Sequence, residues 1–295
     1  MQNRAALKML FIINPGSGNN PTDWPTLITD HFKGHSHILK IYQLDDKCTT
    51  DMIKATMEQF KPDRIIAVGG DGTVKLVAAM LVNTGIPLGI LPAGSANGMA
   101  KELGIPTEAV AALDTAVGGS TVCIHLVKIN DELCIHLADI GFNAFVIKKF
   151  ETEASRGMWG YIKAAWKVLW EQPRMQVDIK VNGKLIKRSA AMVVIANATK
   201  YGSGALINPD GNLQDDVFEV IVVKKISLAE LYKMMVTHLS YNPAKTEVYQ
   251  TSSLTIASRV KAHFQVDGEY LGKVTHLDAR ILPAAINMIV PGETA

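Results

Sequence analysis

The chain has 295 residues, which is ample for two hydrophobic cores and long for one, so two domains are expected. Its 30 basic and 28 acidic residues leave a net charge of +2, and the sequence contains no dense Lys/Arg block of the kind that follows a nucleic-acid backbone. Nucleic acid is therefore not expected as a partner.

The cysteines and the apolar segments predict the compartment. Cys48, Cys123 and Cys134 are odd in number and lack a C-x-x-C pair, which argues against a disulfide framework and against zinc. The apolar run from Met9 to Ile13 is too short for a signal peptide, and Ile281–Gly292 is too short and too interrupted by proline to span a bilayer. We expect a cytoplasmic protein, so that any membrane contact is peripheral and at the inner face.

The first 120 residues alternate short apolar runs with helical patterns. Strands are predicted at Lys8–Ile13, Ile38–Leu44, Arg64–Val68 and Pro87–Leu91. Helices are predicted at Thr50–Phe60, Thr73–Asn83, Ala96–Leu103 and Thr107–Val117. This alternation is typical of a Rossmann-like, parallel α/β domain, assigned to residues 1–120.

After Gly118-Gly119 the pattern changes to β-branched runs joined by the hairpin signals Asn130-Asp131 and Asn182-Gly183. Residues 121–280 are therefore predicted to form a mostly antiparallel β-sandwich domain, interrupted by a helical stretch at Leu228–Leu239 and by the Trp-rich segment Trp159–Trp170. Whether the tail 281–295 packs back on the first domain is left open. The fold class is α/β followed by β, with a ligand site expected in a cleft between the domains.

The stretch Gly69-Gly70-Asp71-Gly72-Thr73 lies where a predicted strand ends and a helix begins. Three glycines permit a close backbone approach, so that N–H groups near the helix N-terminus can face anionic oxygens. Asp71 fits this turn if it holds a cation that bridges to phosphate, or if it accepts a proton from an attacking hydroxyl. The alternative is a tight turn with an acidic helix cap.

Two further turns follow predicted strands. Asn14-Pro15-Gly16-Ser17-Gly18 closes the first strand, and because no G-K-[ST] follows, it is not a P-loop. Leu91–Gly98 opens a helix, and here Ser95 is alternatively a helix cap and Asn97 an ordinary first-turn residue. The carboxyl ends of parallel strands bind ligands, so all three turns are expected to line one crevice.

Near the end of the chain, Gln265–Leu271 places Asp267 and Glu269 on either side of a glycine in a strand-forming region. An Asp-Gly pair usually indicates a hairpin turn. The functional alternative is that this turn presents Asp267 and Glu269 to a substrate hydroxyl.

The motifs N-P-x-S-G at Asn14–Gly18, G-G-D-G-T at Gly69–Thr73, L-P-A-G-S-A-N at Leu91–Asn97 and D-G-E at Asp267–Glu269 together resemble the diacylglycerol kinase catalytic family. That family includes bacterial lipid kinases and sphingosine kinases, with NAD kinases as more distant relatives. The resemblance covers nearly the whole chain.

The resemblance implies an Mg²⁺-dependent kinase of phospholipid metabolism that transfers the γ-phosphoryl of ATP to the hydroxyl of a lipid such as diacylglycerol. It implies Glu269 as the proton acceptor, with Asp267 and Asp71 as rivals. The implied nucleotide-binding residues are Asn14, Pro15, Gly16, Ser17, Gly18, Gln43, Gly69, Gly70, Asp71, Gly72, Thr73, Ser95 and Asn97.

The resemblance also implies a structural or regulatory magnesium site in the loop 209–217, with the Asp215 carboxylate and the backbone carbonyls of Asn212 and Val217 as ligands. Oxygen ligands of this kind suit Mg²⁺ or Ca²⁺. Without the resemblance, this acidic loop is ordinary solvated turn chemistry. Asp216 replaces the glycine usual in the family, which could alter the loop.

Three departures from the family pattern bear on activity. Gly98 replaces a carboxylate, Lys75 an asparagine and Gln43 a threonine. Two rival functions stay open: an NAD kinase-like phosphotransferase, which shares the G-G-D-G loop, and a catalytically silent protein that binds nucleotide or lipid, which these departures suggest. The acceptor lipid and the oligomeric state, including homo-oligomers, are not specified by these residues.

Overall fold

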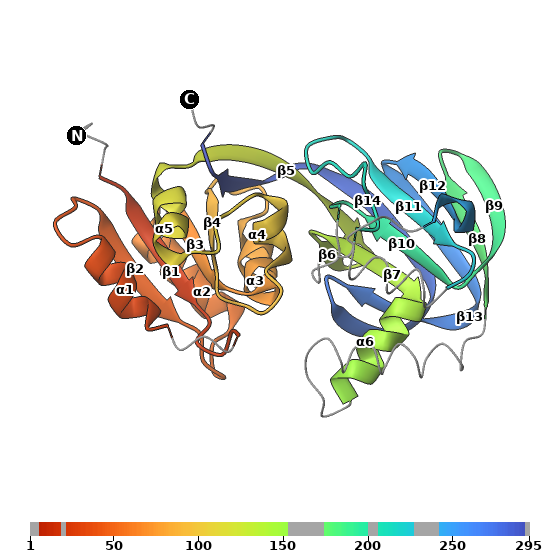
Figure 1. Ribbon diagram of the computed structural model, residues 1–295, viewed down its shortest axis with the longest axis horizontal. Helices are drawn as coiled ribbons and strands as arrows, with labels where there is room; N and C mark the ends of the chain where they lie inside the picture. Colours follow the sequence, from red (N-terminus) through yellow and green to blue (C-terminus); the bar gives the residue numbers. More distant parts are fainter. Residues whose placement is uncertain (1–5, 19–21, 153–173, 200–205, 227–241, 293–295) are drawn as a thin grey trace. The chain divides into compact units, whose positions relative to one another are not determined.

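The computed structural model describes residues 6–18, 22–152, 174–199, 206–226 and 242–292 (Figure 1). The chain divides into two compact units: unit 1 comprises Met1–Ile124 and Ala284–Ala295, and unit 2 comprises His125–Pro283. The predicted segments Trp159–Trp170 and Leu228–Leu239 lie outside the described residues.

Unit 1 is built on a parallel sheet. Its strands are β1 (Lys8–Ile13), β2 (Ile38–Gln43), β3 (Arg64–Gly69) and β4 (Leu88–Pro92). They lie in the order β2-β1-β3-β4, and the end of β14 (Glu269–Val290) pairs in parallel with β4 through Met288 and Leu88. β1, β3 and β4 are almost wholly buried, which explains why each reads as a continuous apolar run rather than an alternating one.

Five helices connect the strands of unit 1: α1 (Trp24–His31), α2 (Thr50–Phe60), α3 (Asp71–Leu81), α4 (Gly98–Glu102) and α5 (Ala109–Gly118). Side chains cap the first turns of three of them: Asp23 accepts from Thr26 N, Thr49 from Met52 N, and Glu108 from Val110 N and Ala111 N. Each cap satisfies N–H groups that the helix itself leaves unpaired. The sequence prediction did not include α1.

The order of the strands places a switch point beside β1. The chain passes from β1 to β2 on one side and later enters β3 on the other side of β1. The connections that leave the carboxyl ends of β1 and β3 therefore diverge, and in open α/β sheets ligands bind at such a point.

Unit 2 is mostly antiparallel. Its strands are β5 (Ser120–Ile129, which begins in unit 1), β6 (Glu132–Cys134), β7 (Leu137–Gly141), β8 (Met175–Val181), β9 (Lys184–Ala190), β10 (Met192–Ala196), β11 (Phe218–Val223), β12 (Thr246–Thr251), β13 (Ser253–Val266) and most of β14. They run in the order β12-β11-β10-β7-β13-β14, while β8 joins β13 to β9 and β5 joins β14 to β6. A helix, α6 (Phe142–Thr152), and a short 3₁₀ turn, Pro243–Lys245, complete the described part of the unit.

Two apolar clusters stabilise unit 2. The larger joins alternate residues of β8, such as Val177 and Ile179, to residues of β10, β11 and β13. The second lies under α6, where Phe142 and Val146 pack with Val194 and others. β10 and β11 contribute to both clusters and are buried on both faces, so unit 2 is a layered sandwich. The fold class predicted from the sequence, a parallel α/β domain followed by a β-sandwich, is confirmed.

Candidate functional site

Three glycine-containing turns of unit 1 meet at the carboxyl ends of β1, β3 and β4. Asn14 N donates to Val68 O (2.9 Å), and Ala93 N donates to Gly69 O (3.0 Å). The turn after β3 thus pairs with the turns on both sides of it. The structure therefore brings together residues that the sequence separates by up to 80 positions.

Asn14 ties the first turn to the second through its side chain. Its Nδ2 donates to Thr73 Oγ1 (3.2 Å), and its Oδ1 accepts from Gly16 N (3.0 Å). The carboxamide is thereby fixed between the β1 turn and the first turn of α3. A hydrophobic side chain at this position would leave Gly16 N and Thr73 without these partners.

Glycine is required where the turns touch. A Cβ atom at Gly94 would lie 2.4 Å from Gly70 Cα, and one at Gly18, whose φ is +68°, would lie 2.4 Å from Ala93 O. Both distances are shorter than any real Cβ contact, so no larger residue fits without moving backbone. The glycines at these two positions allow one backbone to approach another, whereas the sequence pattern predicts glycines that open the backbone toward a ligand.

The Asp71 carboxylate holds the N-terminus of α4. Its Oδ2 accepts from Gly98 N and its Oδ1 from Met99 N, both at 2.9 Å. Asp71 is itself the first residue of α3, so one carboxylate links the starts of two helices. Each oxygen keeps a second lone pair, which can accept a hydrogen bond from a water on a hydrated cation. The acidic cap considered from the sequence is present, but it caps α4 rather than the helix to which Asp71 belongs.

The turn after β4 differs from its prediction. Helix α4 begins at Gly98 rather than at Ala96, because Asn97 is left-handed (φ 51°) and closes a small loop with Gly94. In this loop Asn97 Oδ1 accepts from Gly94 N (2.9 Å) and Asn97 Nδ2 donates to Gly94 O (2.8 Å). Ser95 lies exposed at the tip of the loop. It is therefore not the cap of α4, as one interpretation of the sequence had it.

The remaining residues that were predicted to bind nucleotide differ in how far they are exposed to solvent. Pro15, Gly16 and Gly72 are exposed, whereas Thr73 is buried and holds Asn14. Gln43 ends β2, where it is the register partner of Ile13 at the end of β1, and its side chain is exposed. Gln43 therefore belongs to the same sheet edge as the three turns.

In unit 2, Asp267 and Gly268 form the turn of the β13–β14 hairpin, with φ values of 51° and 89°. The Asp267 carboxylate accepts backbone N–H groups from three successive residues: Ile135 (3.1 Å), His136 (2.8 Å) and Leu137 (3.2 Å). The hairpin expected from the Asp-Gly pair is confirmed. Asp267 anchors this turn to the start of β7.

Glu269 follows the turn and begins β14, and its side chain is exposed. Of the three carboxylates considered as proton acceptors, Asp71 accepts N–H groups from two residues and Asp267 from three, all through the carboxylate oxygens. Glu269 is exposed, whereas Asp71 and Asp267 are half-buried.

A buried pair behind this turn was missed by the sequence prediction. Asp139 and Gln265 are register partners on β7 and β13, and each is only 1% exposed. Asp139 Oδ2 accepts from Gln265 Nε2 (2.5 Å), and Gln265 Oε1 accepts from Gly268 N (2.8 Å). The available signal was an acidic residue inside the apolar run Leu137–Ile140, where burial of a charge is costly unless it is hydrogen-bonded.

The loop 209–217 brings the predicted metal ligands into one compact turn. Asp215 N donates weakly to Asn212 O (3.5 Å), and Val217 N to Asp215 Oδ1 (3.4 Å). These long hydrogen bonds leave the Asn212 carbonyl and the Asp215 carboxylate with lone pairs for a hard cation, so the oxygen donors present fit Mg²⁺ or Ca²⁺. The described residues contain no cluster of three or more His, Cys, Asp or Glu arranged for a metal. A cation here would depend on one carboxylate, backbone carbonyls and water.

A buried glutamate adjoins this loop. Burial raises the pKa of Glu219, against hydrogen bonds from Asn208 and Gln250 that lower it, and the negative charge of Asp215 raises it further. Asn208 Nδ2 lies 2.6 Å from Glu219 Oε2, and Gln250 Nε2 lies 3.0 Å from Oε1.

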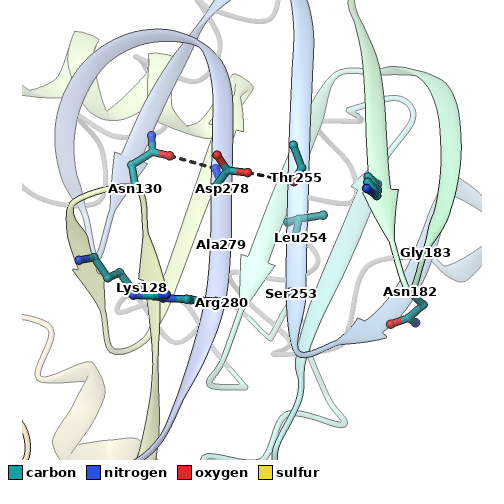
Figure 2. Close-up of a pocket in the computed structure, with 11 residues that line it drawn as sticks. Lys128, Asn130, Asn182, Gly183, Ser253, Leu254, Thr255, Asp278, Ala279 and Arg280 are labelled. Atoms are coloured by element: carbon teal, nitrogen blue, oxygen red, sulfur yellow. Dashed lines mark hydrogen bonds between the residues drawn. The ribbon is translucent and has the colours of Figure 1, made fainter.

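A hollow of about 480 Å³ lies on one face of unit 2. Figure 2 shows the residues that line it. The four strands β5, β14, β13 and β8 contribute to it, and its lining includes Lys128, Lys180, Arg280, Thr255 and Asp278. Thr255 Oγ1 donates to Asp278 Oδ1 (2.9 Å), and that hydrogen bond is the main cause of the lowered pKa of Asp278. None of the predicted site residues lines this hollow, whose three cations outnumber its single carboxylate.

Among the described residues, none of the helices combines the length and apolar character needed to cross a membrane.

Comparisons with known proteins agree with this architecture. Residues 8–129 match the family model described as "Diacylglycerol kinase catalytic domain", and residues 138–290 match the one described as "YegS C-terminal NAD kinase beta sandwich-like domain". An uncharacterized protein of Synechocystis sp. is 30% identical over 99% of this chain and 74% of its own length. A diacylglycerol kinase of Bacillus subtilis is 29% identical over 74% of each chain.

Solved structures show the same fold. A diacylglycerol kinase from Bacillus anthracis superposes with a TM-score of 0.73 at 20% identity, covering 98% of both chains. An NAD kinase from Archaeoglobus fulgidus, solved in complex with ATP, superposes with a TM-score of 0.57 at 12% identity, covering 96% of this chain and 93% of its own. With both family models matched and the fold shared, the chain belongs to the diacylglycerol kinase catalytic family, within the NAD kinase-like superfamily.

Proposed function

We propose that this protein is a lipid kinase that transfers the γ-phosphoryl of ATP to the hydroxyl of diacylglycerol or a related lipid alcohol. The observation that carries the proposal is the meeting of three glycine-containing turns at the switch point of a parallel sheet, in a chain of the diacylglycerol kinase family. Such turns present backbone N–H groups to phosphate oxygens.

ATP is proposed to bind at the three turns of unit 1. Gly16, Ser17 and Gly72 leave exposed or half-buried backbone that phosphates can approach, while Asn14 and Thr73 hold the turns together. The ATP complex of the distantly related NAD kinase supports nucleotide use on this fold. Mg²⁺, when bound with the nucleotide, would neutralise phosphate charge, and Asp71 would orient its water ligands while keeping α4 in place.

Glu269 is proposed to accept the proton of the lipid hydroxyl. The argument rests on the exposure of the Glu269 side chain at the start of β14, directly after the Asp267-Gly268 turn, and on the match of the D-G-E motif to the family's proton acceptor. A carboxylate is a weak base toward an alcohol, but phosphoryl transfer through a loose transition state depends first on orientation, and proton removal comes late.

The Glu269→Gln variant tests this role. The substitution keeps the shape of the side chain and removes its ability to accept a proton, so kcat should fall by about 10²- to 10⁴-fold. ATP affinity, measured by calorimetry, should stay within twofold of the wild-type value. Glu58→Gln, which removes an exposed acid on α2, serves as the charge-matched control. Near-normal turnover by Glu269→Gln would refute the assignment.

The acceptor is tested by transfer of radiolabelled γ-phosphate from ATP into a panel of lipid alcohols in detergent micelles with Mg²⁺. We expect labelled lipid, with no label when Asp71→Ala replaces the wild type. Label in NAD⁺ instead would favour an NAD kinase-like enzyme, a possibility that the NAD kinase fold relation supports. Nucleotide binding without label in any acceptor would favour the silent binding protein.

A further inference from the structure

We propose that Asp139 and Gln265 form a positioning pair that fixes the Asp267–Glu269 turn, and so the reach of Glu269, through the Gly268 amide. The inference rests on the proposed function, because it assigns a purpose to the placement of Glu269. Neither residue touches a reacting atom, and both act through the backbone of the turn.

The hydrogen-bonding rules of the two side chains impose one orientation on Gln265. Asp139 is an acceptor when ionised, so it takes the amide nitrogen Nε2 of Gln265 at 2.5 Å. The amide oxygen Oε1 must then point the other way, where it accepts from Gly268 N at 2.8 Å. Without Asp139, the amide could rotate by 180° and present Nε2, a donor, to the Gly268 N–H.

Asp139 is itself held in place from a second element. Its Oδ1 accepts from Ala144 N (2.8 Å) and its Oδ2 also accepts from Asn143 Nδ2 (2.6 Å), both in the first turn of α6. The carboxylate therefore links β7 and α6 to β13. Displacement of Asp139 would require all of these hydrogen bonds to change together.

The pair works alongside the anchor made by Asp267. The Asp267 carboxylate holds the first residue of the turn to Ile135, His136 and Leu137, and the pair holds its second residue, Gly268. Glu269 comes directly after these two fixed residues. Catalytic groups must be held within about 0.5 Å of a productive geometry, and this double attachment supplies such a restraint.

A hairpin turn does not need a buried acid. Asn182-Gly183 closes the β8–β9 hairpin with nearly the same backbone, φ 50° and 73°, and both residues are exposed. The Asn182 side chain donates to Gln250 O (2.7 Å). Burying the Asp139 charge carries a desolvation penalty that the Asn182-Gly183 turn avoids. The additional restraint at Asp267-Gly268 is therefore better explained by a role in catalysis than by closure of the hairpin.

The test uses Gln265→Glu, Asp139→Asn and the double variant, which places the carboxylate at position 265 and the carboxamide at position 139. Gln265→Glu places two buried carboxyls in contact, so they must share a proton, and one pKa of the pair rises. As the pH rises from about 5 to 8 that proton is lost, the two carboxylates repel each other, and the side chain at position 265 no longer holds Gly268 N. The value of kcat should then fall roughly 10- to 100-fold relative to the wild type. The exchanged pair, Asp139→Asn with Gln265→Glu, restores one donor and one acceptor between the two positions, and rotation of the Asn143 amide lets its Oδ1 accept the second proton of the new Nδ2. This variant should recover most of the turnover and the wild-type pH profile.

Gln250→Glu is the control for the added carboxylate: Gln250 is exposed on β12, and like Gln265 it donates to a buried carboxylate, here Glu219, elsewhere in unit 2. It should leave the KM for ATP and kcat within twofold of the wild-type values. The titratable residues His136, His263 and Asp267 near the turn are present in every variant, and all variants are assayed over one pH range. Thermal unfolding at each pH identifies any variant that has lost its fold.

Hydrogen exchange of the Gly268 amide, followed by NMR, reports on its hydrogen bond to the side chain at position 265 and does not depend on turnover. Faster exchange together with a lower kcat in Gln265→Glu, and recovery of both in the exchanged pair, would support the proposal. Faster exchange with unchanged kcat, or equal loss of kcat in Gln250→Glu, would overturn it. Absence of transfer by the wild type would instead refute the proposed function, and the catalytic purpose of the pair with it.

Discussion

Gly94 and Gly72 lie in neighbouring turns of unit 1, but their surroundings differ. A Cβ at Gly94 meets Gly70 Cα at 2.4 Å, whereas a Cβ at Gly72 has no atom within 4 Å and lies inside helix α3. Gly94→Ala must therefore separate two backbones. Gly72→Ala instead replaces a poor helix former, a change worth up to about 1 kcal/mol in favour of folding.

We expect Gly94→Ala to lower the free energy of unfolding by about 1–3 kcal/mol, the usual cost of overpacking a close contact. Gly72→Ala should leave the stability unchanged or raise it. Urea denaturation of both variants measures the difference. Equal destabilisation would mean that the turns do not touch at Gly70 and Gly94 in solution.

At the scale of elements, an ionic cluster joins three strands of unit 2. Hydrogen bonds from Lys224 and Tyr249, with a further contribution from Arg188, lower the pKa of Glu247 to about 2 from its usual 4.5. The oxygens of Glu247 lie 2.8 Å from Lys224 Nζ and 2.8 Å from Arg188 Nε. Arg188 is on β9 and Glu247 is on β12, while Lys224 directly follows β11.

The pH dependence of this cluster follows from the direction of the shift. Because the pKa of Glu247 is lower in the folded chain, its stabilisation is present above pH 4.5 and is lost as the pH falls toward 2. Glu247→Gln should lower the free energy of unfolding at pH 7 by about 1 kcal/mol, after allowance for solvent screening. The difference from the wild type should shrink between pH 4.5 and pH 2 in chemical denaturation. A difference that is constant with pH would contradict the ionic origin.

The elements also show what could be predicted from the sequence. Strands β1 and β3 and helix α2 were found because buried parallel strands read as apolar runs and α2 has a clear amphipathic period. Helix α1 was missed: its signals, Asp23 followed by Pro25 near the helix start, are short and local. The three turns were identified because glycine, asparagine and aspartate each have specific backbone uses.

The parts of the candidate site that escaped prediction depend on contacts between distant residues. Asp71 caps a helix that begins 27 residues later, and Asp139 pairs with a glutamine 126 residues away. Local propensity carries no information about such partners. The pairing of Asp139 is decided by strand register, and the register of β7 against β13 follows from the packing of unit 2.

At the scale of the molecule, the basic hollow of Figure 2 is where contact with an anionic membrane can be tested. Each basic side chain near an anionic surface contributes about 1 kcal/mol to binding, so Lys128→Gln with Arg280→Gln should weaken binding to phosphatidylglycerol vesicles about 30-fold. Lys54→Gln with Lys61→Gln, on and just after α2, removes the same charge from unit 1 as a control. Sedimentation with anionic and with neutral vesicles measures the binding. Equal losses in both double variants would mean that net charge, not this face, governs attachment.

The end of β14 covers the outer edge of β4, but it is synthesised long after β4. Met288 pairs with Leu88, and Asn83 N donates to Ala285 O (2.9 Å), so β4 acquires its outer neighbour only from residues made about 200 positions later. Until then, a nascent chain carries β4 as an open edge whose N–H and C=O groups can pair with another chain. A chain that is terminated after Pro283 would therefore tend to aggregate, although it already contains every turn of the candidate nucleotide site.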